Sequence, residues 1–254
     1  MIFNTIDNKY ASTLATDTNY NLKTMKDILR KFEIIEKNIQ CAHSHFDFYV
    51  MYAMLLTLPI NGPVIELGCF KGGSTAKISQ ICKLTGRKLY VFDSFKGLPP
   101  PRGNDVEHHV VPWISNRKIL HYKEGSYEGT LEEVKRNIAN YGCIDVCEFV
   151  EGFFENTLPN FQVRPAFIFM DVDYIDSARV VLKNLWPKLL SDGFLFSHEA
   201  NVVDFIEAIT DTTWWQKELN QNPPLLYGAG YGTPWKWGHF TMFSGTVYFH
   251  KHNN

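Results

Sequence analysis

The sequence predicts an α/β fold in which a mostly parallel sheet is covered by helices on both faces. Short apolar segments such as "VIEL", "KLYVF" and "AFIFM" have the length and composition of buried strands. Between them lie "STAKISQICKL", "LEEVKRNIANYG" and "SARVVLKNLWPKL", whose apolar residues recur at helical spacing. Strands that alternate with helices favour parallel pairing, because each helix carries the chain back to the edge where the next strand begins.

The chain is expected to form an N-terminal helical cover, residues 1–60, followed by one compact unit, residues 61–254. "LKTMKDILRKFEIIEKNI" places apolar residues three and four apart, and "FDFYVMYAMLLTLP" is a second helical pattern that ends at Pro59. From Val202 the pattern changes. "FIEAIT" is predicted to be a helix, the glycine- and proline-rich stretch through "WKWGHF" a loop, and "FTMFSGTVYFHK" a closing hairpin or strand pair.

Composition argues against several classes of protein. The 254 residues, 45% of them hydrophobic, are enough for one core, and a formal net charge of −2 gives no electrostatic case for binding nucleic acid. The apolar runs are too short to span a membrane, so no membrane partner is expected. Five scattered cysteines argue against a disulfide framework, and a cytoplasmic location is the default expectation.

The stretch "VIELGCFKGGSTAKIS", residues 64–79, joins a strand to a helix through a glycine-rich turn. Gly68, Gly72 and Gly73 would let backbone N–H groups approach a ligand at the start of the helix, and Ser74 is a candidate N-cap. A tight turn without a ligand is the alternative, since glycine-rich turns occur in many folds.

Two carboxylates narrow the kind of ligand. Asp93 ends the next strand, where nucleotide-binding sheets place an acceptor for ribose hydroxyls. The turn has the spacing E-x-G-x-x-x-G-G instead of the G-x-G-x-x-G of dinucleotide sites, and Glu66 would repel a pyrophosphate. S-adenosylmethionine combines a ribose with an ammonium and a sulfonium group, so the sequence favours it as the cofactor.

The stretch from Lys96 to Gly125 lacks periodicity and contains three consecutive prolines. Long irregular segments inside compact domains are usually functional, and this one leaves the carboxyl end of a strand, where α/β proteins bind ligands. We therefore expect it to be a lid over the site.

Beyond these local patterns, the chain resembles the macrocin O-methyltransferase family over residues 64–199. "VIELGCFKGGST", "VFDSFKGLP", "EEVKRNIANYG", "VEGFFENTLP", "MDVDYIDSA" and "LWPKLLSDGF" follow one another in the family's order and spacing. The resemblance implies a Rossmann-like class I methyltransferase with a seven-stranded, mostly parallel sheet. It also implies an S-adenosylmethionine-dependent O-methyltransferase whose acceptor is a small molecule, a hydroxyl of a sugar or glycosylated natural product.

The resemblance assigns roles to positions of this chain. It implies that the methionine end of the cofactor is held by Glu66, Gly68, Gly72, Gly73 and Ser74, the ribose by Asp93 with Ser94 beside it, and the adenine by Glu151, Gly152 and Phe153. Phe153 would stack on the adenine, and a place in the core is the alternative for this ring.

The catalytic end departs from the family pattern. Asp171 matches the family's metal-binding carboxylate and general base, and Asp173 follows two residues later. Members that use magnesium have two adjacent acidic residues where this chain has His198 and Glu199. A divalent cation bound by Asp171, His198 and Glu199 is expected, and the imidazole favours a transition metal over magnesium. Alternatively, His198 is the base and no metal binds, or Asp171 and Asp173 are helix N-caps.

Some alternatives stay open. The pairs His43–His45 and His108–His109 are weaker candidates for a substrate or catalytic role. The tryptophans of the tail could wall the acceptor pocket, fill the core or form a subunit contact, which leaves a homo-oligomer open; they are Trp214, Trp215, Trp235 and Trp237. A non-catalytic scaffold that binds S-adenosylmethionine and a nicotinamide-dependent oxidoreductase are the rival functions.

Overall fold

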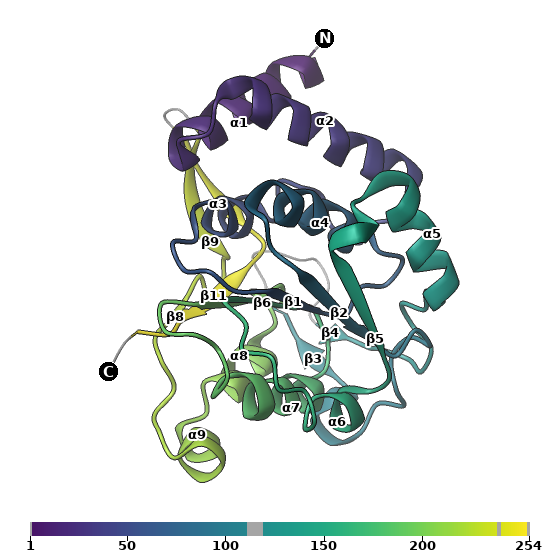
Figure 1. Cartoon of the computed structure of the whole chain (residues 1–254). Helices are drawn as coiled ribbons and strands as arrows, with labels where there is room; N and C mark the ends of the chain where they lie inside the picture. The colour runs from purple at the N-terminus through teal and green to yellow at the C-terminus, as the bar shows by residue number, and fades with distance from the viewer. Residues whose placement is uncertain (1, 111–118, 238–239, 253–254) are drawn as a thin grey trace.

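A seven-stranded sheet runs through the centre of the molecule in the order β5-β2-β1-β6-β7-β11-β8 (Figure 1). The computed structural model describes residues 2–110, 119–237 and 240–252. The strands are β1 (Val64–Leu67), β2 (Leu89–Asp93), β5 (Cys147–Glu151), β6 (Phe167–Met170), β7 (Phe194–Ser197), β8 (Leu226–Tyr227) and β11 (Val247–His250). The first five in spatial order are parallel, β11 runs antiparallel to β7, and β8 antiparallel to β11. The predicted mostly parallel sheet is confirmed.

The central strands are apolar at consecutive positions because helices cover both of their faces. All four residues of β6 are buried, and they divide by parity between two cores. Phe167 and Phe169 belong to the core that lies between the sheet and the N-terminal helices. Ile168 and Met170 belong to the core on the other face of the sheet. A strand with two buried faces therefore explains the continuous apolar run.

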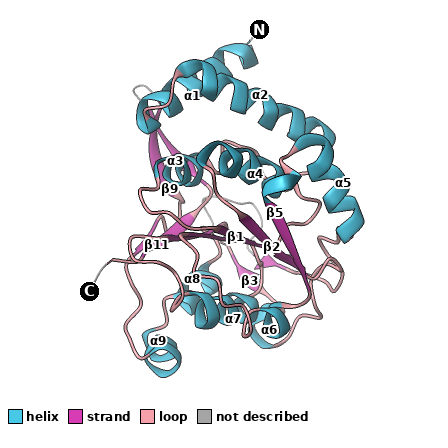
Figure 2. Ribbon diagram, viewed as in Figure 1, coloured by secondary structure: helices cyan, strands magenta, loops and turns pink. Residues whose placement is uncertain are grey.

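The helices form unequal layers on the two faces (Figure 2). One face carries α3 (Tyr49–Thr57), α4 (Gly73–Thr85) and α5 (Leu131–Tyr141), and the other carries α6 (Phe154–Thr157), α7 (Ile175–Leu185) and α8 (Val203–Ile209), with α9 (Thr212–Leu219) beyond them. Within the described ranges, none of the helices combines the length and the apolar composition that a membrane span requires.

The N-terminal helices α1 (Ile2–Thr18) and α2 (Leu22–Asn38) add a layer outside α3 and α4 (Figure 1). The Thr24 N–H donates to the Asn21 side chain at 2.8 Å, which caps the start of α2. One stripe of α2 is buried, at the helical spacing expected from the sequence; its members are Met25, Ile28, Leu29, Phe32 and Ile35. The boundary between a cover and a second unit at residue 60 stays a prediction.

The C-terminal hairpin prediction is wrong. The strand β10 (Phe240–Ser244) pairs with β9 (Thr233–Trp237), which lies in the segment expected to be a loop, and β11 leaves this ribbon to join β7. The apolar pattern of two strands is correct, but the edge of β7 offers β11 a buried partner in the main sheet. Local spacing does not encode that choice.

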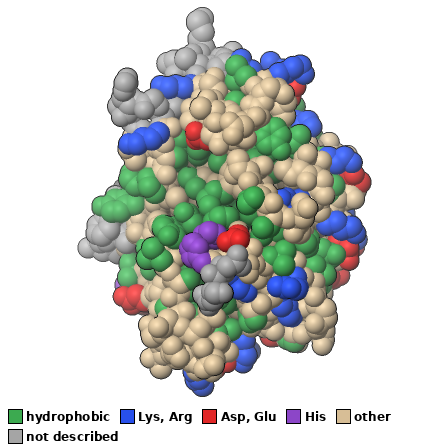
Figure 3. All heavy atoms as spheres, turned by 60° about the vertical axis from the view of Figure 1, so that its left-hand side comes forward, with side chains coloured by type: hydrophobic (Ala, Val, Ile, Leu, Met, Phe, Trp, Pro, Cys, Tyr) green, Lys and Arg blue, Asp and Glu red, His purple; other side chains and the backbone are tan. Residues whose placement is uncertain are grey.

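Two of the four tail tryptophans, Trp215 and Trp235, belong to the core, Trp214 packs against it partly buried, and the side chain of Trp237 lies outside the described residues. Trp215 is fully buried, and Trp235 stacks on Tyr49 with ring centroids 4.0 Å apart. Figure 3 shows apolar side chains gathered on the face that carries the C-terminal strands. The exposed large apolar residues of this segment are Leu225, Tyr227, Tyr231, Met242 and Phe243. A homo-oligomer stays a prediction.

Candidate functional site

A cavity of about 270 Å³ opens at the carboxyl edge of the parallel strands. Each of four neighbouring strands contributes to its lining directly at its end: Gly68 after β1, Asp93 at the end of β2, Asp171 after β6 and His198 after β7. The sequence predicted these convergences, because the carboxyl ends of parallel strands meet at one edge of the sheet.

The glycine turn after β1 depends on close backbone approach. Gly68 has φ +83°, and a Cβ there would lie 1.9 Å from the Asp171 carbonyl oxygen. A Cβ on Gly73 would lie 2.4 Å from the Cys41 sulfur, so the segment before α3 packs directly on the turn. Gly72 is the left-handed N-cap of α4 and faces α5 instead of the cavity. Ser74, in the first turn of α4, lines the cavity but is not the N-cap, so that part of the prediction is wrong.

Asp93 is held rigidly by backbone donors. The Cys69 N–H donates to its Oδ2 at 2.7 Å, and the Phe95 N–H donates to its Oδ1 at 2.8 Å. Burial raises the pKa of Asp93 even though these hydrogen bonds favour the carboxylate. Both oxygens accept backbone hydrogen bonds, and because Asp93 also lines the cavity a ligand hydroxyl could donate to it.

Glu66 lies in the middle of β1 and is fully buried. Neither of its carboxylate oxygens meets a hydrogen-bond partner among the described residues, and burial raises the pKa of Glu66 to about 8. The nearby Ser74 and Thr75 hydroxyls offset only part of that cost. Glu66 does not line the cavity, because its position in the strand points it under α4 instead of past the carboxyl edge.

The residues expected at the adenine end are partly brought together. Gly152 and Phe153, after β5, line the cavity, and the Gly152 N–H donates to the Asp93 carbonyl at 2.9 Å. Ser94 also lines the cavity, where its hydroxyl donates to the Gly97 carbonyl at 2.8 Å and so closes the turn after β2. Glu151 is exposed and lies outside the lining, at the end of the edge strand β5.

Three side chains gather at the opposite end of the cavity. His43 Nε2 lies 3.5 Å from Asp171 Oδ2, and the rings of His43 and His198 have centroids 3.4 Å apart. Donor atoms of all three lie within 4.8 Å of one another, which places them within reach of a single metal ion. His43 comes from the loop before α3, whereas Asp171 and His198 follow β6 and β7 much later in the sequence.

The charges in this cluster are unequal. Burial alone would raise the pKa of Asp171, but its hydrogen bond and attraction to His43 hold that pKa below its usual value. Burial and the positive charge of His43 lower the pKa of His198 to about 4. Burial also opposes the charged form of His43, but Asp171 outweighs it and raises the pKa of His43. Asp171 is therefore ionised and His198 neutral near pH 7.

The predicted metal set of Asp171, His198 and Glu199 stays a prediction, and the group of donor atoms that lies close together has a different third member. Glu199 is buried, and its Oε1 accepts from the Val172 and Asp173 N–H groups at 3.2 and 3.1 Å, while its Oε2 accepts from the Ser197 hydroxyl. Glu199 lines the same cavity, but its carboxylate is not among the three groups whose donor atoms lie close together; the third is His43.

The helix-cap alternative for the aspartates is also wrong. Asp105 from the irregular stretch accepts from the Ile175 N–H at 2.6 Å and the Asp176 N–H at 3.3 Å, so it caps the start of α7. Asp173 has φ +58° and lines the cavity, where burial raises its pKa well above the usual range.

The irregular stretch from Lys96 to Gly125 borders the cavity at both of its ends. Leu98 and Pro99 line one end and Tyr122 the other, and the Leu98 N–H donates to the Ser126 carbonyl at 2.9 Å. The short strands β3 (His108–His109) and β4 (Ile119–Leu120) pair with each other, and β3 packs against α8. Residues 111–118, which are part of the predicted lid, lie outside the described residues.

The histidine pairs separate into one cavity residue and three others. His45 is buried against Glu36, His108 is buried beside Tyr122 and Tyr174, and His109 Nδ1 lies 2.7 Å from Asp204 Oδ2. Of these four histidines, only His43 reaches the cavity. The stretch "CAHSHFD" carries no local signal that separates the two residues: a spacing of two would put both side chains on one face of an extended segment, yet His43 enters the cavity and His45 packs on Glu36.

Comparisons with known proteins agree with this geometry. The profile of the family described as macrocin-O-methyltransferase (TylF) matches residues 47–225. The O-methyltransferase NovP superposes with a TM-score of 0.58 at 20% identity over 92% of this chain and 84% of its own. CalS11, a calicheamicin methyltransferase, gives a TM-score of 0.54 at 14% identity over 89% of this chain and 92% of its own. A comparison with curated protein sequences gave no significant match.

The sheet order, the glycine turn after β1 and the carboxylate at the end of β2 define an S-adenosylmethionine-dependent methyltransferase. Because the family profile covers most of its length, the chain belongs to the macrocin O-methyltransferase family. Nothing in the comparisons favours the nicotinamide-dependent oxidoreductase or the non-catalytic scaffold.

Proposed function

We propose that this O-methyltransferase methylates a sugar hydroxyl of a small-molecule acceptor, with His43, Asp171 and His198 at the site of transfer. The observation that carries the proposal is one cavity with a ribose-type carboxylate, Asp93, at one end and the converging His43–Asp171–His198 cluster at the other. Methyl transfer needs the acceptor oxygen in line with the methyl group, so a shared cavity is a physical requirement.

We assign the cofactor to the half of the cavity beneath β1, β2 and β5. Gly68, Gly73 and Ser74 would contact the methionine part, Asp93 would accept from the ribose hydroxyls, and Phe153 would stack on the adenine. Gly72 and Glu66 would not contact the cofactor directly: Gly72 would shape the turn, and the positive groups of the bound cofactor would favour the ionised form of Glu66 over the protonated form. When bound, S-adenosylmethionine supplies the electrophilic methyl group.

The other half of the cavity has the character of a sugar site. Polar side chains of Asp173, Ser177 and Asn201 line it together with the ring of Tyr122. A raised pKa keeps the Asp173 carboxyl protonated well above its usual range, so it can donate as well as accept a hydrogen bond. A dense set of such groups matches an acceptor rich in hydroxyls.

We infer a divalent cation held by His43, Asp171 and His198. The donor set fits: one ionised carboxylate and one neutral imidazole are present, and the donor atoms of the three residues are already close together. Two nitrogens and one oxygen favour manganese, iron, cobalt or zinc over magnesium. When bound, such an ion would supply Lewis acidity to a nearby hydroxyl, and Asp171 would accept the proton that the acceptor loses.

The test is product analysis with labelled S-adenosylmethionine and a panel of glycosides and free sugars, before and after chelation. Label should appear as an alkali-stable methyl ether on a sugar, and chelation should abolish transfer while leaving binding of S-adenosylhomocysteine intact. Full activity in excess chelator would remove the cation from the proposal and leave a protein base. Transfer to a non-sugar hydroxyl alone would remove the acceptor class.

A further inference from the structure

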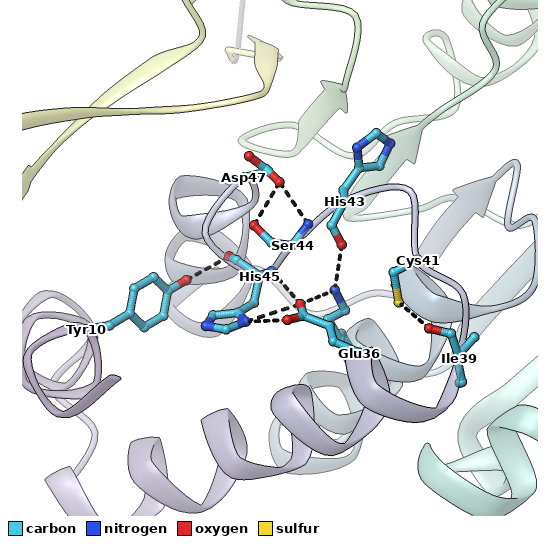
Figure 4. A network of polar contacts seen from close by, with 9 residues as sticks. Tyr10, Glu36, Ile39, Cys41, His43, Ser44, His45 and Asp47 are labelled. Atoms are coloured by element: carbon cyan, nitrogen blue, oxygen red, sulfur yellow. Dashed lines mark hydrogen bonds and ion pairs between the residues drawn. The ribbon is translucent and has the colours of Figure 1, made fainter. Parts of the chain in front are cut away.

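A polar network lies directly behind the loop that carries His43 (Figure 4). Lys77, on α4, is fully buried; its Nζ donates to Glu36 Oε1 at 2.7 Å and to the His43 carbonyl oxygen at 3.1 Å. Glu36, on α2, also accepts from the His45 N–H at 2.6 Å, and its Oε2 lies 3.1 Å from His45 Nδ1. The network therefore forms hydrogen bonds with the backbone on both sides of Ser44, at the His43 carbonyl and the His45 N–H.

A contribution to stability alone does not explain this network. A buried lysine loses its hydration, and a hydrophobic replacement of a buried ion pair is often neutral or stabilising. Burial opposes the charge on Glu36, yet the hydrogen bonds and charges of His45 and Lys77 lower the pKa of Glu36 to about 2. Lys77, Glu36 and His45 do not line the cavity, so contact with a ligand does not account for them either.

The loop connects the network to the site through His43. In Figure 4 the His43 carbonyl faces the network, whereas its ring points away from it. That ring lies against Asp171 and His198. The far end of the loop is tied separately, because the Asp47 Oδ2 accepts from the Ser44 N–H at 2.8 Å and the Asp47 carbonyl accepts from the Gly245 N–H at 2.8 Å.

We propose that Lys77 and Glu36 are positioning residues that set the place of the His43 ring in the methyl-transfer site. The inference rests on the proposed role of His43. Helix α4 starts in the glycine turn and carries Lys77 one turn later, so one rigid element fixes both the cofactor turn and the loop of His43. Buried support of a ligand by a second layer of residues is a general feature of metal sites.

A double-mutant cycle of Lys77→Met and His43→Ala tests this coupling. Metal binding is read from the visible absorption of added Co²⁺, cofactor binding from titration with S-adenosylhomocysteine, and turnover from kcat. Lys77→Met should weaken Co²⁺ binding and lower kcat, each by about tenfold, as loss of outer-layer support typically does. Affinity for S-adenosylhomocysteine should not change. In the His43→Ala background, Lys77→Met should have no further effect on either quantity, because the ring it positions is gone.

Arg87→Met is the matched control. Arg87, unlike the fully buried Lys77, is only partly buried, but its side chain also donates to backbone carbonyls, those of Gly62 and Leu58, at the other end of the sheet. The substitution Arg87→Met should lower the free energy of unfolding and leave the Co²⁺ spectrum and kcat unchanged. If Lys77→Met does not fold, Glu36→Gln replaces it, since the amide keeps an acceptor for the His45 N–H and loses the charge that holds Lys77.

The outcomes separate the two levels of the argument. Losses from Lys77→Met that are as large in the His43→Ala background as in the wild type would show a general structural effect and overturn the inference. A normal Co²⁺ spectrum and kcat in both Lys77→Met and Glu36→Gln, with His43→Ala impaired, would overturn the inference alone. Normal Co²⁺ binding and kcat in His43→Ala would overturn the proposed site as well.

Discussion

Replacing Glu66 by Gln should stabilise the protein without its cofactor, increasingly so as the pH rises. Glu66 is a fully buried carboxyl whose oxygens meet no hydrogen-bond partner among the described residues, and burial raises its pKa from 4.5 to about 8. The unfolded chain releases this proton near pH 4.5, whereas the native state keeps it up to about pH 8. Between these values the native state binds more protons, so the free energy of unfolding falls as the pH rises.

The size of the effect follows from the shift. At pH 7 the unfolded carboxyl is about 2.5 pH units above its pKa, which at about 1.36 kcal/mol per unit lowers the stability of the native protein by about 3 kcal/mol. The loss grows to about 5 kcal/mol above pH 8, where the shift is fully expressed. Glutamine has nearly the same shape and no proton to lose, so Glu66→Gln should remove this dependence.

Urea unfolding of the two proteins between pH 4 and pH 9 measures the difference directly. The curves should coincide at pH 4 and separate steadily above it, with the variant more stable. Glu148→Gln, an exposed carboxylate on β5, is the control and should follow the wild type at every pH. A difference between Glu66→Gln and wild type that does not change with pH would refute the reasoning, because the titrating group would then lie elsewhere.

The same substitution should weaken binding of S-adenosylmethionine. A buried carboxyl that destabilises the free protein is tolerated where function requires it, and the positive groups of this cofactor would favour its ionised form. Stability gained together with affinity lost would mark Glu66 as a functional carboxylate. Affinity equal to that of the wild type would leave it as a buried residue of the strand with no role in binding.

The other predictions concern the turn, the ribose carboxylate and the irregular stretch. Asp93→Ala should weaken binding of S-adenosylhomocysteine by about 1.5–3 kcal/mol, the worth of a hydrogen bond to a charged group, in calorimetry; unchanged affinity would contradict the ribose assignment. Gly68→Ala should cost well above the roughly 1–2 kcal/mol of a left-handed residue, since its Cβ would meet the Asp171 carbonyl, whereas Gly86→Ala, with φ +68° and open space, should cost only that strain in urea unfolding. Proteolysis between Lys96 and Gly125 should slow when cofactor and acceptor are both bound, and equal cleavage with and without them would mean a static segment.

Sequence reasoning succeeded where the determinants are periodic or local. Alternating apolar strands and amphipathic helices specify a parallel sheet, and a parallel sheet brings all strand carboxyl ends to one edge. Gly68, Asp93 and Asp171 could therefore be assigned to one site from their places at strand ends. The same reasoning could not foresee that Glu66 and Glu151 lie outside the cavity lining, and their roles toward the cofactor stay predictions.

Only the tertiary structure decided which groups complete the catalytic end. His43 reaches Asp171 because α2 and α4 hold its loop over the sheet edge, and no local pattern encodes a contact between elements so far apart. Glu199 stands beside His198 in the sequence and lines the same cavity, yet its Oε1 accepts from backbone donors after β6, and His43 completes the cluster. The sequence by itself determined the sheet and its cofactor edge through repeating local interactions. Long-range packing determined the side chains that converge there, because their positions depend on every element between them.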